Sequence, residues 1–423
     1  MLKINKQEDN STLAWIVTLT VSLFFFYEFI QMNLFNTINA DLRKTFQLDA
    51  VGLGQFFSMY FYGNALFLFP AGNLIDRYST KKILLFAVSI CTVGTFFFAL
   101  ATVYWLAALG RFMEGLGASF CFLSCIRVAS RWFPPAKMAF VTGVIVTMAM
   151  VGGLVAQTPF AFLSHALGSW RYALLANAIL GILIGIAILV IVKDRPPNSQ
   201  AQAKADQHQL KTLGLWQCIK VAAFNPQNWF GGLYTALINL PVFILGGLWG
   251  VLYLVQVHHL TLNQASYATT AFFIGVIIGS PLFGFFSDKL GRRVLPMIIG
   301  AILSLISILI LMYMPSLSLW PLIFIFCLIG LVTSSQVLTY PMLAELNPIY
   351  LTSTAISIDS VCIMVSGFIV PPFFGWLMER ETSSSGIYVA QNFHHALLII
   401  PFCFLIALLI TPFMQETYCR SQG

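Results

Sequence analysis

Three carboxylic acids lie inside long apolar runs of the chain. Glu28 stands in SLFFFYEFIQMN, Glu114 in RFMEGLGAS and Asp359 in TAISIDSVCIM. Placing a charge in hydrocarbon costs roughly 2.5–3.5 kcal/mol or more, so such groups pair with another charge, line a cavity or serve function. An acid in a partly dry site binds a proton more readily than one in water. The pattern predicts proton binding at all three acids.

Arg111 precedes Glu114 by three residues, so the two side chains share one face of a helix. This spacing fits a self-neutralising structural pair, and it equally fits an arginine that contacts a substrate or the coupling acid. Arg111 is also the predicted partner of Glu28 across a central cavity. The residues predicted to line that cavity, each of which also fits simple helix packing, are Glu28, Gln31, Arg111, Gln157, Asn239, Trp249, Tyr253 and Gln336.

Motifs of enzyme chemistry are absent from the sequence. It contains no GxxxxGK[ST], GxSxG or HExxH segment, which argues against a nucleotide cofactor and against hydrolytic chemistry. The eight cysteines are scattered without CxxC or Cys/His metal spacing. We therefore expect a protein that is not an enzyme and that carries no cofactor and no metal.

The composition is that of a membrane protein. Hydrophobic residues make up 59% of the chain and charged residues 9%, and the mean hydropathy is +0.85. Soluble domains carry about 25% charged residues. We therefore expect the chain to be embedded in a lipid bilayer. Its net charge of +7 is interpreted as a sign of membrane topology rather than of nucleic-acid binding.

Segments of about 20 apolar residues are long enough to cross a bilayer as helices. The twelve predicted spans are 12–36, 51–75, 81–103, 105–130, 136–163, 169–192, 228–256, 264–286, 292–314, 318–342, 351–378 and 394–415. The polar stretch 193–227 divides them into two sets of six. The predicted organisation is an all-α protein with an N-terminal six-helix bundle (1–192), a cytoplasmic linker (193–227) and a C-terminal six-helix bundle (228–423).

Lys and Arg are concentrated in the loops on one side of this arrangement, including both termini and the central linker. The opposite side holds only Arg43, Lys44, Arg171 and Arg380. Because positively charged loops stay on the cytoplasmic side, both termini are predicted to be cytoplasmic.

The two predicted bundles carry related loops. GNLIDRYSTKK follows the second span and GFFSDKLGRR follows the eighth. Each has a glycine, then an aspartate four residues later, then several cations. A duplicated six-helix unit explains the repeat, and duplicated halves are typical of secondary transporters.

These loops resemble the signature loops of the major facilitator superfamily. RFMEGLGAS and GSWRYALLANA also resemble motifs of its fourth and sixth helices. The resemblance implies a gate in which Asp76 faces the positive end of a neighbouring helix, while Gly72 and Gly284 let helices approach closely. The predicted gating residues are Gly72, Asp76, Arg77, Arg127, Gly284, Asp288 and Arg292.

Three further segments, FYEFIQ, LWGVLYL and AELNP, resemble the sugar-phosphate-permease-like branch and phagosomal transporters of intracellular bacteria. Organophosphate carriers of that branch are expected to hold phosphate with arginines in helices 1 and 7. Here the first helix has Gln31 and Met32 at that place and 228–256 has no cation. The lack of these cations argues against a phosphate ester as the substrate.

These observations predict a secondary transporter that imports a small polar organic solute together with protons by alternating access. The expected solute is an amino acid-like zwitterion, or an organic acid or siderophore. Two alternatives remain open: proton-coupled efflux, and a transporter-like sensor that binds its ligand without moving it. The expected location is a bacterial inner membrane, as a multi-pass monomer whose partners are the solute, protons and lipid.

Overall fold

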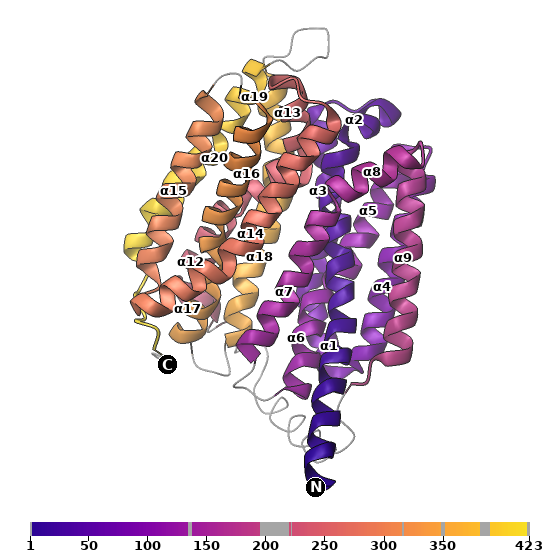
Figure 1. Cartoon of the computed structure of the whole chain (residues 1–423), viewed down its shortest axis with the longest axis vertical. Helices are drawn as coiled ribbons and strands as arrows, with labels where there is room; N and C mark the ends of the chain where they lie inside the picture. Colours follow the sequence, from indigo (N-terminus) through magenta and orange to yellow (C-terminus); the bar gives the residue numbers. More distant parts are fainter. Residues whose placement is uncertain are drawn as a thin grey trace. The chain divides into compact units, whose positions relative to one another are not determined.

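The computed structural model describes residues 2–133, 138–194, 220, 222–314, 317–347, 352–380 and 390–420. All regular structure in these ranges is helical, without any strand (Figure 1). Ten described helices are long and apolar enough to cross a membrane. The pair α7 and α8, bent by 41° at their junction, makes an eleventh if the two form one span. The all-helical membrane fold expected from composition is thus confirmed.

The chain divides into two compact units. Unit 1 comprises Met1–Met32, Met59–Ala156 and Phe162–Thr212. Its helices, of which α3 and α8 each belong only in part to this unit, are α1 (Leu2–Asn33), α3 (Ala50–Arg77), α4 (Thr80–Leu100), α5 (Tyr104–Ala118), α6 (Cys121–Trp132), α7 (Met138–Val155), α8 (Thr158–Ala166) and α9 (Trp170–Ile191).

Small residues let the helices of unit 1 approach each other closely. Gly115 of α5 lies against the backbone carbonyl oxygen of Tyr60 in α3, where a Cβ atom would not fit. Gly94 of α4 and Gly110 of α5 each face the other's carbonyl oxygen in the same way. Such contacts are the usual means of helix association in membranes. They place α5, which carries Arg111, directly against α3 and α4.

Unit 2 comprises Asn33–Ser58, Gln157–Ala161 and Leu213–Gly423. Its elements, besides the remaining parts of α3 and α8, are α2 (Phe35–Phe46), α12 (Pro226–Ile238), η2 (Val242–Leu248), α13 (Gly250–Val257), α14 (Leu262–Leu290), α15 (Val294–Tyr313), α16 (Leu319–Thr333), η3 (Ser334–Leu338), α17 (Thr339–Leu346), α18 (Thr352–Glu379), α19 (Ala390–Leu397), α20 (Ile399–Ile410) and η5 (Thr411–Phe413).

The predicted span 228–256 is interrupted in the structure. It consists of α12, the π-helical segment η2 and α13, and Pro241 stands where the regular hydrogen bonding of α12 stops. Proline has no backbone N–H to donate, so it breaks the ladder of helical hydrogen bonds. Pro371 and Pro372, by contrast, lie inside the continuous helix α18.

Gly284 was expected to allow a close helix approach, and this prediction is wrong for the described residues. A Cβ atom added at Gly284 would meet nothing within 4 Å. The close contact between α14 and α16 lies earlier in α14, at Gly275 and Gly279, which face the backbone carbonyl oxygens of Cys327 and Leu331. The glycine of the loop motif therefore lies outside the helix contact that holds α14 to α16.

Candidate functional site

Glu28 is buried near the C-terminal end of α1, with 5% of its surface exposed. The hydroxyl group of Tyr60 on α3 donates a hydrogen bond to its Oε1 atom. Its Oε2 atom has no hydrogen bond among the described residues. A carboxylate in a dry interior that lacks a cationic partner is costly to ionise. The surroundings of Glu28 therefore favour the uptake of a proton.

Arg111 and Glu114 form a fully buried ion pair on α5. Arg111 Nη1 lies 2.6 Å from Glu114 Oε2, and it also donates a hydrogen bond of 2.8 Å to the backbone oxygen of Gln31. The guanidinium carbon lies 5.1 Å from the ring centroid of Tyr60 and 6.0 Å from that of Phe98. Stacking over aromatic faces adds to the stabilisation of the buried cation.

The structure changes the predicted partner of Glu28. Arg111 was expected to pair with Glu28, but its ion pair is made with Glu114, three residues away on its own helix. Glu28 is held instead by the hydroxyl of Tyr60. Tyr60 thus contacts both Glu28 and Arg111. In the sequence, nothing distinguishes Tyr60 from the other aromatic residues of α3.

Gln31 lies one turn after Glu28 on α1 and is fully buried. Its Nε2 atom donates a hydrogen bond of 2.6 Å to Oγ1 of Thr95 on α4. The hydroxyl of Tyr27 lies 3.2 Å from the same threonine oxygen. The residues of unit 1 that were predicted as site residues, Glu28, Gln31, Arg111 and Glu114, are therefore brought together at the contacts among α1, α3, α4 and α5.

Gln157 lies in unit 2, between α7 and α8. Its Nε2 atom donates to the backbone oxygen of Gly246 in η2 at 2.9 Å. Its Oε1 atom accepts from Nδ2 of Asn36 on α2 at 3.1 Å. Asn36 Nδ2 also lies 2.9 Å from the backbone oxygen of Leu245, and Asn36 Oδ1 accepts from the backbone N–H of Val251.

A second asparagine of α2 extends this contact. Asn39 Nδ2 donates to the backbone oxygen of Leu248 at 2.6 Å. The departure from α-helical hydrogen bonding in η2 leaves backbone groups that must find other partners inside a membrane protein. Side-chain amides of Asn36, Asn39 and Gln157 supply them. Gln157 was predicted as a site residue but the two asparagines were not, although their spacing of three residues places them on one helical face.

The remaining predicted cavity residues also belong to unit 2. Trp249, at the end of η2, is buried with its ring 5.7 Å from that of Phe374. The Tyr253 hydroxyl donates to the backbone oxygen of Leu311 at 3.2 Å. Asn239 caps the C-terminal end of α12, and Gln336 lies in the 3₁₀ segment η3.

Three predicted gating residues, Gly72, Asp76 and Arg77, lie at the end of α3. Their side chains are outside the described part of the structure. Arg127 lies on α6, one turn before the end of that helix. The residue as a whole is partly exposed, as expected near the membrane surface.

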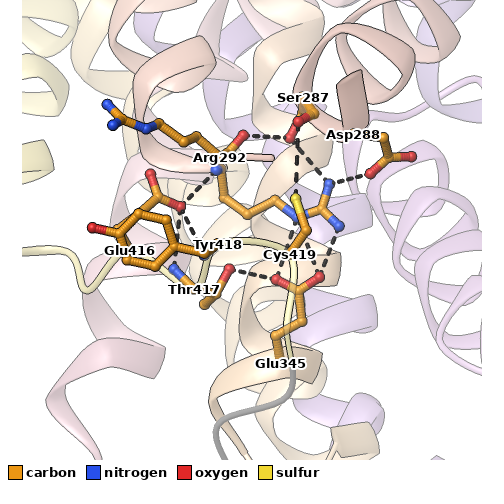
Figure 2. Close-up of polar contacts among 9 residues, drawn as sticks. Ser287, Asp288, Arg292, Glu345, Glu416, Thr417, Tyr418 and Cys419 are labelled. Atoms are coloured by element: carbon orange, nitrogen blue, oxygen red, sulfur yellow. Dashed lines mark hydrogen bonds and ion pairs between the residues drawn. The ribbon is translucent and has the colours of Figure 1, made fainter. Parts of the chain in front are cut away.

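Asp288 takes part in an ionic network centred on Arg293, shown in Figure 2. Arg293 Nη1 lies 2.7 Å from Asp288 Oδ1, and its Nη2 lies 2.7 Å from Glu345 Oε1. Glu416 accepts from the backbone N–H groups of Arg293 at 2.7 Å and of Val294 at 3.0 Å. The network ties the ends of α14 and α17 and the C-terminal segment to the start of α15.

Arg292 was one of the predicted gating residues, but its side chain is exposed, and the neighbouring Arg293 makes the ion pairs with Asp288 and Glu345. Burial alone would lower the pKa of Arg293. The hydrogen bonds that Arg293 donates to the carboxylates of Glu345 and Asp288 outweigh burial and hold its pKa above the usual value. The sequence offered two adjacent arginines, and only the turn at Gly291, with φ of +63°, decides which one points inward.

Comparisons with known proteins agree with this fold. The sequence model of the Major Facilitator Superfamily matches residues 20–263 and 231–417. The chain is 24% identical over 257 residues to the hexuronate transporter of Bacillus subtilis (strain 168), covering 60% of this chain and 59% of that protein. It is 22% identical over 330 residues to the lysosomal dipeptide transporter MFSD1 of Homo sapiens, covering 75% and 70%.

A solved structure is similar over nearly its whole length. It is a bacterial homologue of the human lysosomal transporter Spinster, in an inward-facing and unoccupied conformation. The TM-score is 0.75 at 16% identity, with 95% of this chain and 97% of that chain covered. The likeness therefore establishes the fold. Together with the family match from residue 20 to residue 417, it shows that the chain belongs to the Major Facilitator Superfamily of membrane transporters.

Proposed function

We propose that the protein imports a small organic acid or zwitterion together with protons by alternating access. The buried ion pair of Arg111 and Glu114 is the observation that carries this proposal. The pair is fully buried, and Arg111 Nη1 lies 2.6 Å from the carboxylate. Removing two charges from water is costly, and such pairs are weak evidence for stability alone. A functional role explains why the chain keeps it.

The pair offers a direct coupling between proton and substrate. Protonation of Glu114 removes its negative charge, and the guanidinium of Arg111 then lacks a counter-charge. A substrate carboxylate can take the place of Glu114, because Arg binds carboxylates through a planar set of donors. Proton and anion thus enter together, and the site returns to the Arg111–Glu114 pair after both have left.

Glu28 supplies a second protonatable group beside this pair. It shares Tyr60 with Arg111, since the tyrosine hydroxyl contacts Glu28 and the ring lies beneath the guanidinium. A change of charge at Glu28 therefore acts on the same tyrosine that supports Arg111. Glu28 and Glu114 carry the protons in this proposal. Asp359, the third acid of the predicted set, belongs to unit 2.

An organic acid is the first choice of substrate class. The name of the hexuronate transporter refers to a sugar acid, whose carboxylate matches Arg111. A zwitterion such as a short peptide is the second choice, because a lysosomal dipeptide transporter is also similar to the chain. Its ammonium group would need a carboxylate partner, for which Glu28 is available.

The proposal includes the predicted topology. It has twelve spans in two six-helix bundles, 1–192 and 228–423, joined by the linker 193–227. Both termini are cytoplasmic, and the protein is a monomer in a bacterial inner membrane. The proposed substrate contacts are Glu28, Gln31 and Arg111 in unit 1, and Gln157, Asn239, Trp249, Tyr253 and Gln336 in unit 2.

Purified protein in proteoliposomes provides the test. With glucuronate or a dipeptide as labelled solute, an inward proton gradient should drive accumulation, and a proton ionophore should abolish it. Glu114→Gln should lose gradient-driven accumulation but keep exchange of internal for external solute. Asp41→Asn, which makes the same change at an exposed acid of α2, should behave as wild type.

The same assay separates the alternatives. Extrusion of preloaded solute against its gradient, with no uptake in the opposite direction, would replace import by efflux. Ligand binding without flux in either direction would favour a sensor. Gradient-driven uptake that is unaffected in both Glu114→Gln and Glu28→Gln would refute the assignment of the proton to unit 1.

A further inference from the structure

Asp359 is fully buried on α18 in unit 2, inside the candidate span Ala355–Glu379. Its carboxyl group faces the hydroxyls of Thr235 on α12, and of Thr339 and Tyr340 at the start of α17. Neither of its oxygens makes a hydrogen bond of standard geometry among the described residues. A buried carboxyl group surrounded by hydroxyls but not hydrogen-bonded by them needs an explanation.

The hydroxyl protons of the two threonines are already in use. Thr339 Oγ1 donates to the backbone oxygen of Gln336 at 2.7 Å, and Thr235 Oγ1 lies 3.1 Å from the backbone oxygen of Gly231. The two threonine oxygens also lie 2.7 Å from each other. Two protons shared among these three contacts leave none for Asp359. When both protons are used in this way, the two hydroxyls turn oxygen lone pairs toward the carboxyl group, an arrangement that a bound cation stabilises.

The residues that the structure describes supply no cationic side chain as an ion-pair partner for Asp359. The titratable groups that face it are Tyr340 and Cys362, neither of which carries a positive charge. An unpaired charge at this depth is strongly disfavoured. A cation bound from outside the chain would supply the missing positive charge.

Two helices are irregular next to these threonines. α12 ends at Ile238, three residues after Thr235, and the 3₁₀ segment η3 directly precedes Thr339. Non-helical backbone at membrane depth is tolerated where it is buried in protein or lines a water-filled cavity. In secondary transporters, interrupted helices of this kind coordinate the coupling ions.

We propose that Asp359, Thr235, Thr339 and Tyr340 form a binding site for a sodium ion. The ligands are all oxygen atoms, which hard cations prefer. One carboxylate neutralises one monovalent charge, whereas a divalent ion would leave a net positive charge in the membrane. The described residues contain no cluster of three or more His, Cys, Asp and Glu side chains that would suit a divalent or transition metal. This site goes beyond proton-coupled uptake, because unit 2 would bind a sodium ion at a place separate from the proton-binding acids of unit 1.

The unfolding temperature of the purified full-length protein tests the site. It is measured at constant ionic strength and pH while NaCl replaces KCl or choline chloride. A ligand that binds only the folded state raises the unfolding temperature with concentration. The wild type should show a saturable rise with Na⁺ that K⁺ and choline do not reproduce. Asp359→Asn should lose this rise, and Glu28→Gln should keep it.

Conservative variants distinguish the loss of a sodium ligand from misfolding of the protein. Thr235→Ser keeps the ligand oxygen and should retain Na⁺ stabilisation, whereas Thr235→Val should weaken Na⁺ binding at least tenfold. Direct binding of ²²Na⁺ to the same two variants gives a second reading if Asp359→Asn does not fold. An unfolding temperature of the wild type that is the same in Na⁺, K⁺ and choline would overturn the proposal. A response to pH without any response to Na⁺ would do so too, and would assign a proton to Asp359.

Different experiments refute the sodium site and the proposed proton-coupled uptake. Gradient-driven uptake in sodium-free medium tests proton coupling in unit 1 alone. Na⁺ stabilisation of the protein without any substrate tests unit 2 alone. Loss of the first result leaves the sodium site standing, and loss of the second leaves proton-coupled uptake standing.

Discussion

The hydroxyl of Tyr60 donates a hydrogen bond to Glu28, while the ring of the same tyrosine lies 5.1 Å from the guanidinium carbon of Arg111. Both partners are buried, so the contact is shielded from water. Tyr60 therefore has two separable roles: its oxygen acts on the acid and its ring acts on the cation.

Replacing Tyr60 by phenylalanine removes the oxygen and keeps the ring. Loss of a donor to a buried acceptor costs about 1–3 kcal/mol. We expect Tyr60→Phe to lower the unfolding temperature and to slow gradient-driven uptake. Tyr62→Phe, at an exposed position two residues along the same helix, should do neither. Equal behaviour of the two variants would show that the Tyr60 hydroxyl contributes nothing.

The Arg111–Glu114 pair predicts strong non-additivity. Arg111→Gln leaves Glu114 as an uncompensated buried charge, and breaking a buried pair in this way costs about 3–5 kcal/mol. The double variant Arg111→Gln/Glu114→Gln removes both charges and should recover most of that stability. Unfolding measurements on wild type, the two single variants and the double variant give the coupling energy. Additive effects of the two substitutions would contradict the ion pair.

Local patterns in the sequence predicted the parts of the site that depend on one helix. The spacing of Arg111 and Glu114 placed them on one face, and they do pair. The partner of Glu28 depends on how α1 and α3 pack, and no local pattern encodes which residue of α3 faces Glu28. The same holds for Thr235 and Thr339 beside Asp359, which meet only because α12, α17 and α18 pack together.

Apolar length and composition predicted the helices well, but not where they are interrupted. The region 228–256 reads as one apolar run, yet the π-helical segment η2 divides it. The amphipathic helix α2 was not foreseen, because its polar residues resembled a loop after the first span. The asparagine side chains of α2 donate hydrogen bonds to backbone carbonyl oxygens of η2. The helix α2 therefore stabilises the interrupted backbone of η2.

Two glycines of α14 give a test of helix packing. Gly275 lies against the backbone oxygen of Cys327, with no room for a Cβ atom, whereas Gly284 faces open space. Alanine at 284 avoids the helix cost of glycine, which is about 0.5–1 kcal/mol. Gly284→Ala should therefore leave the unfolding temperature unchanged or raise it, and Gly275→Ala should lower it. The opposite order would contradict the packing of α14 against α16.

Neighbouring arginines give a matched pair of variants at the ionic network. Arg293 contacts Asp288 and Glu345, and its side chain is 9% exposed, whereas the Arg292 side chain is exposed. Arg293→Gln should lower the unfolding temperature, because it leaves Glu345 partly buried without its cation. Arg292→Gln removes the same charge from an exposed site and should have little effect. A larger loss for Arg292→Gln would contradict the central place of Arg293 in this network.

His258, in the loop after α13, gives a prediction about pH. Burial, and to a lesser degree the nearby His259, lowers its pKa from the usual 6.5. Its Nε2 atom lies 3.2 Å from the hydroxyl of Tyr253. Between the lowered pKa and 6.5, the unfolded chain binds more protons than the folded protein at this residue. Stability therefore rises with pH in that range and is lost as pH falls below about 6.5.

The variant His258→Gln keeps a polar side chain but cannot titrate. Its unfolding temperature should fall less than that of the wild type when the pH is lowered from 7.5 to 5.5. His165→Gln, at an exposed position at the end of α8, serves as the control and should follow the wild type. If His258→Gln and the wild type lose the same stability on acidification, the neutral form of His258 is not favoured in the folded state. The contact between His258 and Tyr253 would then tolerate the charged ring, because the tyrosine oxygen can accept a hydrogen bond from it.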